Sequence, residues 1–236
     1  MIIINNGVPK SATTLVYQFQ MDLINAASSA NGLQAFKDRN EGWHWVPTVT
    51  DDILEQMLEV DSEYGCFVFC THSPPEKNTL RLIEEFGAKL TCGFRDPRDN
   101  VLSMIDHGAK TRAGGDLTGA FEQIRTIQDG VEAVKWRAGI FEGWKDNSGV
   151  LMVKYEDLME DKPTVLRHIS EFCGLSCDED ALRGLVHKYD ALNYKTHTFN
   201  KGNCYRWKDE MSPEDLAFCN QQLRDEIVMM GYSLEH

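Results

Sequence analysis

Short apolar runs alternate along this chain with longer stretches whose apolar residues recur at helical spacing. The apolar runs predict strands, and the helical spacing follows at residues 15–23, 76–86 and 163–173. The predicted strands cover residues 2–4, 66–70, 89–95 and 150–153. Strands that alternate with helices indicate an α/β fold: a single-domain parallel sheet flanked by helices. The wholly apolar run at residues 66–70 is typical of a central strand covered on both faces.

The segments between these elements are less regular. Three glycines between His107 and Asp116 predict a mobile loop, and a long helical stretch is expected from Leu117 to Lys145. The length of 236 residues favours one domain, which we place at residues 1–233. Residues 234–236 are interpreted as a possible remnant of an expression tag.

The first fifteen residues combine a strand, a tight loop and the start of a helix. Backbone N–H groups at a helix start bind anions, and this loop adds the charge of Lys10 and the hydroxyls of Ser11, Thr13 and Thr14. A simple helix cap explains the hydroxyls but neither Lys10 nor Pro9. The pattern therefore predicts a phosphate site.

Chemically active side chains also follow two later strands. His72 comes just after residues 66–70, and Arg95 ends the strand that begins at Lys89. Ligands of open α/β sheets bind beyond the carboxyl ends of the strands. Asp96, Pro97 and Asp99 fit the start of a helix, on which Ser103 lies on the same face as Asp96. We expect Arg98 to be an ordinary surface arginine.

Composition excludes several classes of protein. The formal net charge of −13 and the pI near 4.9 argue against a surface for nucleic acid or an anionic membrane. No apolar run reaches the ~20 residues of a membrane span, and no signal-peptide pattern precedes the first strand, so a cytoplasmic location is expected. The seven cysteines lack zinc-finger spacing, and we expect reduced thiols and no metal site.

Four motifs resemble those of sulfotransferases that use 3′-phosphoadenosine 5′-phosphosulfate (PAPS). Pro9-Lys-Ser-Ala-Thr-Thr-Leu15 is similar to the family's Pro-Lys-Ser-Gly-Thr-Thr-Trp loop, and Thr71-His-Ser-Pro74 to its Lys-Thr-His-x-Pro segment. The run from Arg95 to Ser103 resembles Arg-(Asn/Asp)-Pro-(Arg/Lys)-Asp-x-x-x-Ser. Lys201-Gly202, with Trp207-Lys208, is similar to the family's Arg-Lys-Gly-x-x-x-x-Trp-Lys stretch.

The resemblance implies a P-loop-like sulfotransferase fold and a role for each matching residue. His72 is implied as the general base, and His107 is its first alternative. Lys10 is implied as the group that stabilises the leaving phosphate. The 5′-phosphosulfate is implied at Lys10, Ser11, Ala12, Thr13 and Thr14, with Leu15 at the adenine. The 3′-phosphate is implied at Arg95, Ser103, Lys201 and Gly202. Tyr155 is implied to lie near the adenine.

The chain departs from the family pattern at four positions. Ala12 replaces a glycine, Leu15 an aromatic residue, Cys70 a lysine and Asn200 an arginine. Because of these changes, one alternative is a non-catalytic module that binds 3′-phosphoadenosine 5′-phosphate (PAP). A P-loop ATP or GTP phosphotransferase is another alternative, although its loop has a glycine before the lysine, where Pro9 stands here.

The expected activity is transfer of a sulfuryl group from PAPS to a hydroxyl or amine of a small-molecule acceptor. Trp43, Trp45 and residues 107–116 are candidates to line the acceptor pocket. The two tryptophans fit equally well as anchors of a long loop on the core. The sequence does not name the acceptor.

Overall fold

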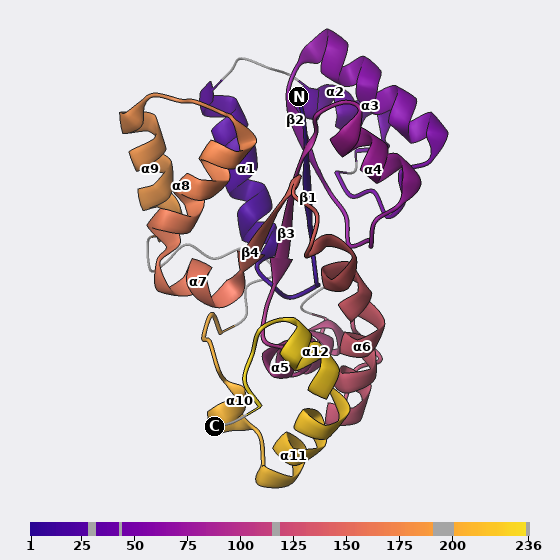
Figure 1. The fold of residues 1–236 in the computed structure, drawn as a ribbon, viewed down its shortest axis with the longest axis vertical. Helices are drawn as coiled ribbons and strands as arrows, with labels where there is room; N and C mark the ends of the chain where they lie inside the picture. The colour runs from indigo at the N-terminus through magenta and orange to yellow at the C-terminus, as the bar shows by residue number, and fades with distance from the viewer. Residues whose placement is uncertain (28–31, 43, 115–118, 191–200, 235–236) are drawn as a thin grey trace.

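A computed structural model describes residues 1–27, 32–42, 44–114, 119–190 and 201–234. Its sheet holds four parallel strands in the order β2-β1-β3-β4. The predicted α/β architecture with a parallel sheet is confirmed (Figure 1). The strands are β1 (Ile2–Gly7), β2 (Phe67–Cys70), β3 (Lys89–Phe94) and β4 (Val150–Lys154).

Alternate residues of β1 face opposite layers of the molecule, as the pleat of a strand requires. Ile3 packs with the helices on one face, whereas Ile2 and Ile4 pack with those on the other. The first face is covered by α1 (Thr13–Ala27), α8 (Lys162–Cys173) and α9 (Glu179–Asp190). The second is covered by α2 (Gly32–Arg39), α3 (Asp51–Tyr64), α4 (Lys77–Glu84) and α6 (Ile127–Trp144).

The remaining helices lie toward the carboxyl ends of the strands, at the lower end of Figure 1. They are α5 (Pro97–Arg112), α7 (Tyr155–Glu160), α10 (Trp207–Glu210), α11 (Pro213–Gln222) and α12 (Arg224–Met229). The last described residues belong to this region: Ser233 accepts a hydrogen bond from Arg98, and Leu234 packs against the core. No helix within the described ranges has the length and apolar character needed to cross a bilayer.

Residues 66–70 were expected to form a central strand, and this expectation was wrong. β2 is the edge strand, with β1 and β3 in the centre. Both of its faces are nevertheless covered, because Phe67 and Phe69 pack in the core on one side and Val68 and Cys70 in the core on the other. A parallel bridge from Trp45 to Cys70 lies on its outer edge. The Val46 N–H donates to the Cys70 carbonyl at 2.8 Å, so the edge is shielded by the preceding segment.

Residues 107–116 were expected to form a loop, but α5 continues through Arg112. Gly108 is there for close packing, because a Cβ at this position would lie 2.3 Å from the Phe121 carbonyl oxygen. Arg112 donates to the carbonyls of Glu122 and Ile124 and so fixes the next segment on the helix end. Residues 115–116 lie outside the described part of the chain.

The helix expected from residue 117 begins ten residues later, at Ile127. A capping box sets this start: Thr126 accepts from the Asp129 N–H, and the Asp129 carboxylate accepts from the Thr126 N–H. Phe121 therefore belongs to a turn, with a φ of 61° in the left-handed region, and not to the helix.

Candidate active site

The loop between β1 and α1 is held at both ends by the sheet. The Val8 N–H donates to the Gly93 carbonyl at 2.8 Å, and the Asn5 amide donates to the Thr13 carbonyl at 3.0 Å. Within the loop Lys10 and Ala12 have φ angles of 72° and 62°, in the left-handed region that favours glycine. The position where the sequence has Ala12 in place of a glycine is therefore a strained one.

Two polar side chains of this loop, Ser11 and Lys10, are withdrawn from solvent fully or in part. Ser11 is buried, and its Oγ has no hydrogen-bond partner among the described residues. A buried hydroxyl without a partner costs free energy unless a ligand supplies one. Lys10 is half-buried, and its Nζ lies 3.1 Å from Nδ1 of His107, a buried residue of α5.

His72 follows β2 at the carboxyl edge of the sheet, beside this loop. Its Nδ1 lies 2.6 Å from the Gly7 carbonyl oxygen, which accepts the proton of that nitrogen and leaves Nε2 as the basic atom of the neutral ring. Burial, together with the charges of Arg137 and Lys10, lowers the pKa of His72 to about 4, and the hydrogen bond to the Gly7 carbonyl opposes that shift. The imidazole is therefore neutral near pH 7.

Helix α6 supports the segment that carries His72. The indole Nε1 of Trp144 donates to the Ser73 carbonyl at 2.9 Å, and the Asn6 amide donates to the same oxygen at 2.8 Å. On its other side the His72 ring meets Trp45 edge-to-face, with centroids 4.6 Å apart. Trp45 is 37% exposed, so it borders both the imidazole and solvent.

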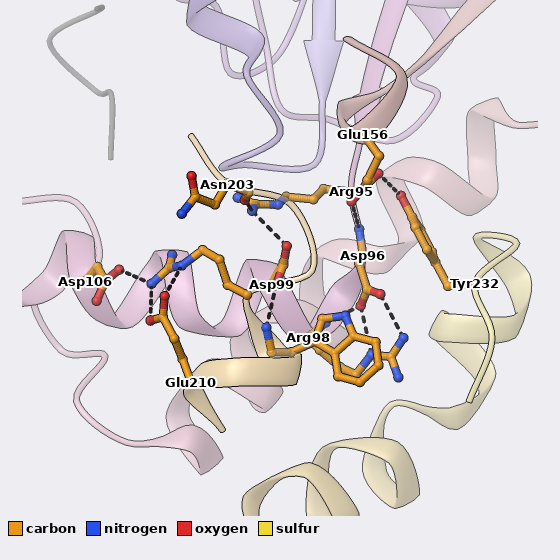
Figure 2. Close-up of polar contacts among 11 residues, drawn as sticks. Arg95, Asp96, Arg98, Asp99, Asp106, Glu156, Asn203, Glu210 and Tyr232 are labelled. Atoms are coloured by element: carbon orange, nitrogen blue, oxygen red, sulfur yellow. Dashed lines mark hydrogen bonds and ion pairs between the residues drawn. The ribbon is translucent and has the colours of Figure 1, made fainter. Parts of the chain in front are cut away.

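A second group of charged side chains lies where β3 ends (Figure 2). The Arg95 guanidinium lies 3.9 Å from the centroid of the Tyr155 ring. One of its nitrogens donates to Asp99 Oδ2 at 2.9 Å and to the Asn203 carbonyl at 2.6 Å. Its Nε is buried and has no partner among the described residues. Arg95 is thus joined to Asp99 but retains one N–H for a further acceptor.

Asp99 links α5 to the C-terminal region instead of capping its own helix. Its Oδ1 accepts the Trp207 N–H at 3.1 Å, while Oδ2 pairs with Arg95. Burial raises the pKa of the Asp99 carboxyl, and Arg95 opposes that shift. The cap of α5 is Asp96, whose side chain accepts the Arg98 N–H at 2.9 Å.

The expectation that Arg98 is a surface arginine was wrong, because its side chain is 1% exposed. It pairs with Asp96 at 2.8 Å and its guanidinium lies 3.7 Å from the Trp207 ring centroid. It also donates to the Ser233 carbonyl and to Asn220. Arg98 therefore fastens three C-terminal segments to the start of α5.

Sequence reasoning missed Arg206, which is also buried. Its guanidinium donates to Asp106 on α5 at 2.6 Å and to Glu210 at 2.8 Å (Figure 2). The hydrogen bond from Arg206 lowers the pKa of Glu210 to about 2. The one feature of the sequence that could have drawn attention to Arg206 was its position directly before the Trp207-Lys208 motif.

Around Arg95 the structure brings together some of the predicted site residues. Arg95 contacts Tyr155, the first residue of α7, and Asn203, which follows Gly202. Ser103 is buried on α5, one helical turn after Asp99. Lys201 is exposed and pairs with Glu210 at 2.7 Å.

Other predicted features fall outside this cluster. Thr13, Thr14 and Leu15 form the first turn of α1, and Cys70 is buried at the end of β2. Trp43 and Asn200 lie outside the described residues. Within the described ranges, no three His, Cys, Asp or Glu side chains are grouped so as to hold a metal ion.

Comparison with known proteins decides the family. Residues 2–228 match the profile of the family described as the sulfotransferase domain. The chain belongs to the sulfotransferase family. A curated relative, human sulfotransferase 4A1, is 28% identical over 131 residues, which are 52% of this chain and 46% of that protein. In this match the sulfotransferase domain spans about half the length of its curated relative.

Solved structures share the fold of this sulfotransferase over nearly its whole length. Mouse sulfotransferase SULT7A1 complexed with PAP has a TM-score of 0.57 at 14% identity, with 98% of this chain and 89% of that chain covered. Retinol dehydratase in complex with androsterone and inactive cofactor PAP has a TM-score of 0.57 at 18% identity, with 100% and 82% covered. The P-loop-like sulfotransferase fold predicted from the sequence is confirmed.

Proposed function

We propose that this sulfotransferase moves a sulfuryl group from PAPS to a hydroxyl or amine of a small-molecule acceptor. The observation that carries the proposal is that two separate groups of cationic and polar side chains lie beyond the carboxyl ends of the strands, and we assign each group to one anion. Lys10 and Ser11 belong to the first group, and Arg95 belongs to the second. PAPS has phosphate groups on both its 3′ and 5′ sides, whereas an ATP-type ligand needs only one such site.

The residues present fit such a nucleotide. Ser11 Oγ and Arg95 Nε are buried atoms without partners among the described residues, one in each proposed anion site. Lys10 and Ser11, with the backbone N–H groups of residues 12–14, would hold the 5′-phosphosulfate. Arg95 and Ser103 would hold the 3′-phosphate, with Gly202 and Lys201 beside them, and Tyr155 would lie near the adenine.

When bound, PAPS supplies an activated sulfuryl group and leaves as PAP. His72 Nε2 is proposed to take the proton of the acceptor hydroxyl or amine as that atom bonds sulfur. The neutral imidazole suits this role, because Nδ1 already carries a proton directed at Gly7. Lys10 would offset the negative charge that builds on the leaving phosphate.

The acceptor is proposed to lie against Trp45, whose ring meets His72 and is partly exposed. A complex of retinol dehydratase, a protein of similar fold, contains androsterone beside PAP. Small apolar alcohols or phenols are therefore the first class of acceptor to test. The side chains of α5 from His107 onward are candidates for the opposite wall.

Calorimetry with PAP, AMP and adenosine 5′-phosphosulfate tests the two anion sites. We expect PAP to bind more tightly than AMP, and Arg95→Met to reduce PAP affinity more than affinity for adenosine 5′-phosphosulfate. Equal binding of PAP and AMP would contradict the assignment. A requirement for Mg²⁺ would favour the ATP or GTP phosphotransferase instead.

Transfer of ³⁵S from labelled PAPS tests catalysis. His72→Ala should keep PAP binding and lose about 10²–10⁴-fold in turnover. Full turnover in this variant would place the base elsewhere, with His107 as the first alternative. PAP binding without transfer to any acceptor would identify a non-catalytic binding module.

A further inference from the structure

Arg137 is a half-buried cation of α6 that has no carboxylate partner among the described residues. Its guanidinium donates to the Ala133 carbonyl of its own helix at 3.0 Å. The same group lies 5.3 Å from the ring centroid of Phe121 and 4.7 Å from that of Trp136. None of these three contacts brings a negative charge.

Arg137 lies on the side of α6 that faces the proposed active site. Trp144 is seven residues later, on the same helix face, and donates to the carbonyl of Ser73, the residue after His72. The helix end also packs tightly on the segment after His72, since a Cβ at Gly143 would lie 2.2 Å from Pro75. Arg137 also lies close enough to His72 for its charge to lower the pKa of the imidazole.

A chain of ring contacts connects Arg137 with the phosphate loop. The Phe121 ring meets His107 edge-to-face at 5.5 Å, and His107 contacts Lys10. The backbone beside Phe121 is held in place, since Thr111 Oγ1 donates to the Ala120 carbonyl at 3.0 Å. Phe121 therefore separates Arg137 from the side of the site where the nucleotide sulfate is proposed to lie.

Burial lowers the pKa of Arg137, which reflects the cost of removing a guanidinium from water without an anion to offset it. The molecule carries 37 acidic residues, yet none of those described pairs with this cation. A guanidinium presents N–H groups in a planar fork that matches a carboxylate. Its environment is that of a receptor for an oxyanion.

We infer that Arg137 binds a carboxylate of the acceptor and makes this sulfotransferase selective for hydroxy acids. The inference rests on the proposed function and refines it, because it names a class of acceptor. We favour a carboxylate of the acceptor over the nucleotide sulfate, since the sulfate is assigned to Lys10. Phe121 and His107 lie between Lys10 and Arg137. Acceptor hydroxyl and carboxylate would then lie on the His72 and Arg137 sides of one pocket.

The test uses matched acceptor pairs, each a hydroxy acid and its methyl ester, both aliphatic and phenolic, with ³⁵S transfer as the readout. We expect the acid of at least one pair to exceed its ester about tenfold or more in kcat/KM, the effect of one hydrogen-bonded charge pair. Arg137→Gln should remove the preference by lowering kcat/KM for the acid alone. Arg137→Lys should keep part of it, because the charge remains but the fork is lost.

Lys135→Gln is the matched control, because it removes one positive charge from an exposed position of the same helix. The acid preference should survive in this variant. Calorimetry with PAP and thermal unfolding accompany each variant, and Arg137→Gln should change neither result appreciably.

Three results would overturn the inference. One is the absence of any acid preference across the panel. The second is an acid-to-ester ratio that Arg137→Gln leaves unchanged. The third is an equal loss of kcat/KM on acids and esters in Arg137→Gln, together with weaker binding of PAPS. That result would assign Arg137 to the sulfate of the nucleotide. Failure of the wild type to bind PAP would instead contradict the proposed function, so the two failures remain distinct.

Discussion

Lys10 Nζ lies 3.1 Å from His107 Nδ1, although 97 residues separate them in the sequence. An ammonium can only donate, so Nδ1 accepts and the proton of the neutral ring is on Nε2. His107 is buried and its ring packs against Phe121, which fixes the accepting nitrogen. α5 thereby holds the loop lysine in a defined position at the site where sulfuryl transfer is proposed.

We expect His107→Phe to lower kcat for sulfuryl transfer about tenfold or more, because the variant keeps an aromatic ring but offers Lys10 no acceptor. His107→Asn should retain most of the rate, since its amide oxygen replaces Nδ1. Steady-state kinetics checks both, with KM for PAPS measured alongside. A double variant with Lys10→Met should be no slower than Lys10→Met alone; additive losses would show that His107 does not act through Lys10.

Ala12 is expected to reduce stability because its φ of 62° suits glycine better than alanine. We expect Ala12→Gly to raise the free energy of unfolding by about 0.5–1 kcal/mol, the relief of strain minus the added entropy of the unfolded chain. Urea denaturation measures the change. Gly174→Ala is the reverse control, since Gly174 caps α8 at φ 64° with no atom within 4 Å of an added Cβ. That variant should lose about 1 kcal/mol.

Features specified by neighbouring residues were predictable from the sequence. Asp96 and Pro97 mark the start of α5, as expected, and Gly174 directly follows the predicted helix and ends α8 in the left-handed conformation that favours glycine. The order of the strands was not predictable, because β2 has both faces covered although it lies at the edge of the sheet, and an apolar run reports only that the faces are covered. The sequence pattern records burial but not what provides it.

Arg98 and Gly108 show why parts of the site were not predictable. The burial of Arg98 depends on Trp207 and Ser233, more than 100 residues away, and nothing near Arg98 in the sequence records those contacts. Gly108 suggested a loop, but its lack of a side chain serves the close approach of Phe121 to α5. Long-range packing decided both positions, so local pattern gave the wrong answer.

Arg98→Met is expected to destabilise the protein by about 3–5 kcal/mol, because it leaves the buried carboxylate of Asp96 without its cation. Asp96→Asn in the same chain should recover part of the loss, since asparagine still caps α5 but carries no charge. Urea denaturation of both variants measures the effect. A double variant less stable than Arg98→Met would show that the unpaired charge is not the cause.

The free energy of unfolding should depend on pH through His72. Its pKa is lowered from 6.5 to about 4 in the folded protein, so between these values the unfolded chain binds a proton that the folded chain does not. Stability is therefore lost as the pH falls through this window, by at most about 1.4 kcal/mol for each pH unit. His72→Gln should lose less stability between pH 7 and pH 5 than the wild type, as measured by urea denaturation at about those two values. His168→Gln, at an exposed position of α8, is the control and should follow the wild type; equal slopes for all three proteins would contradict the assigned pKa of His72.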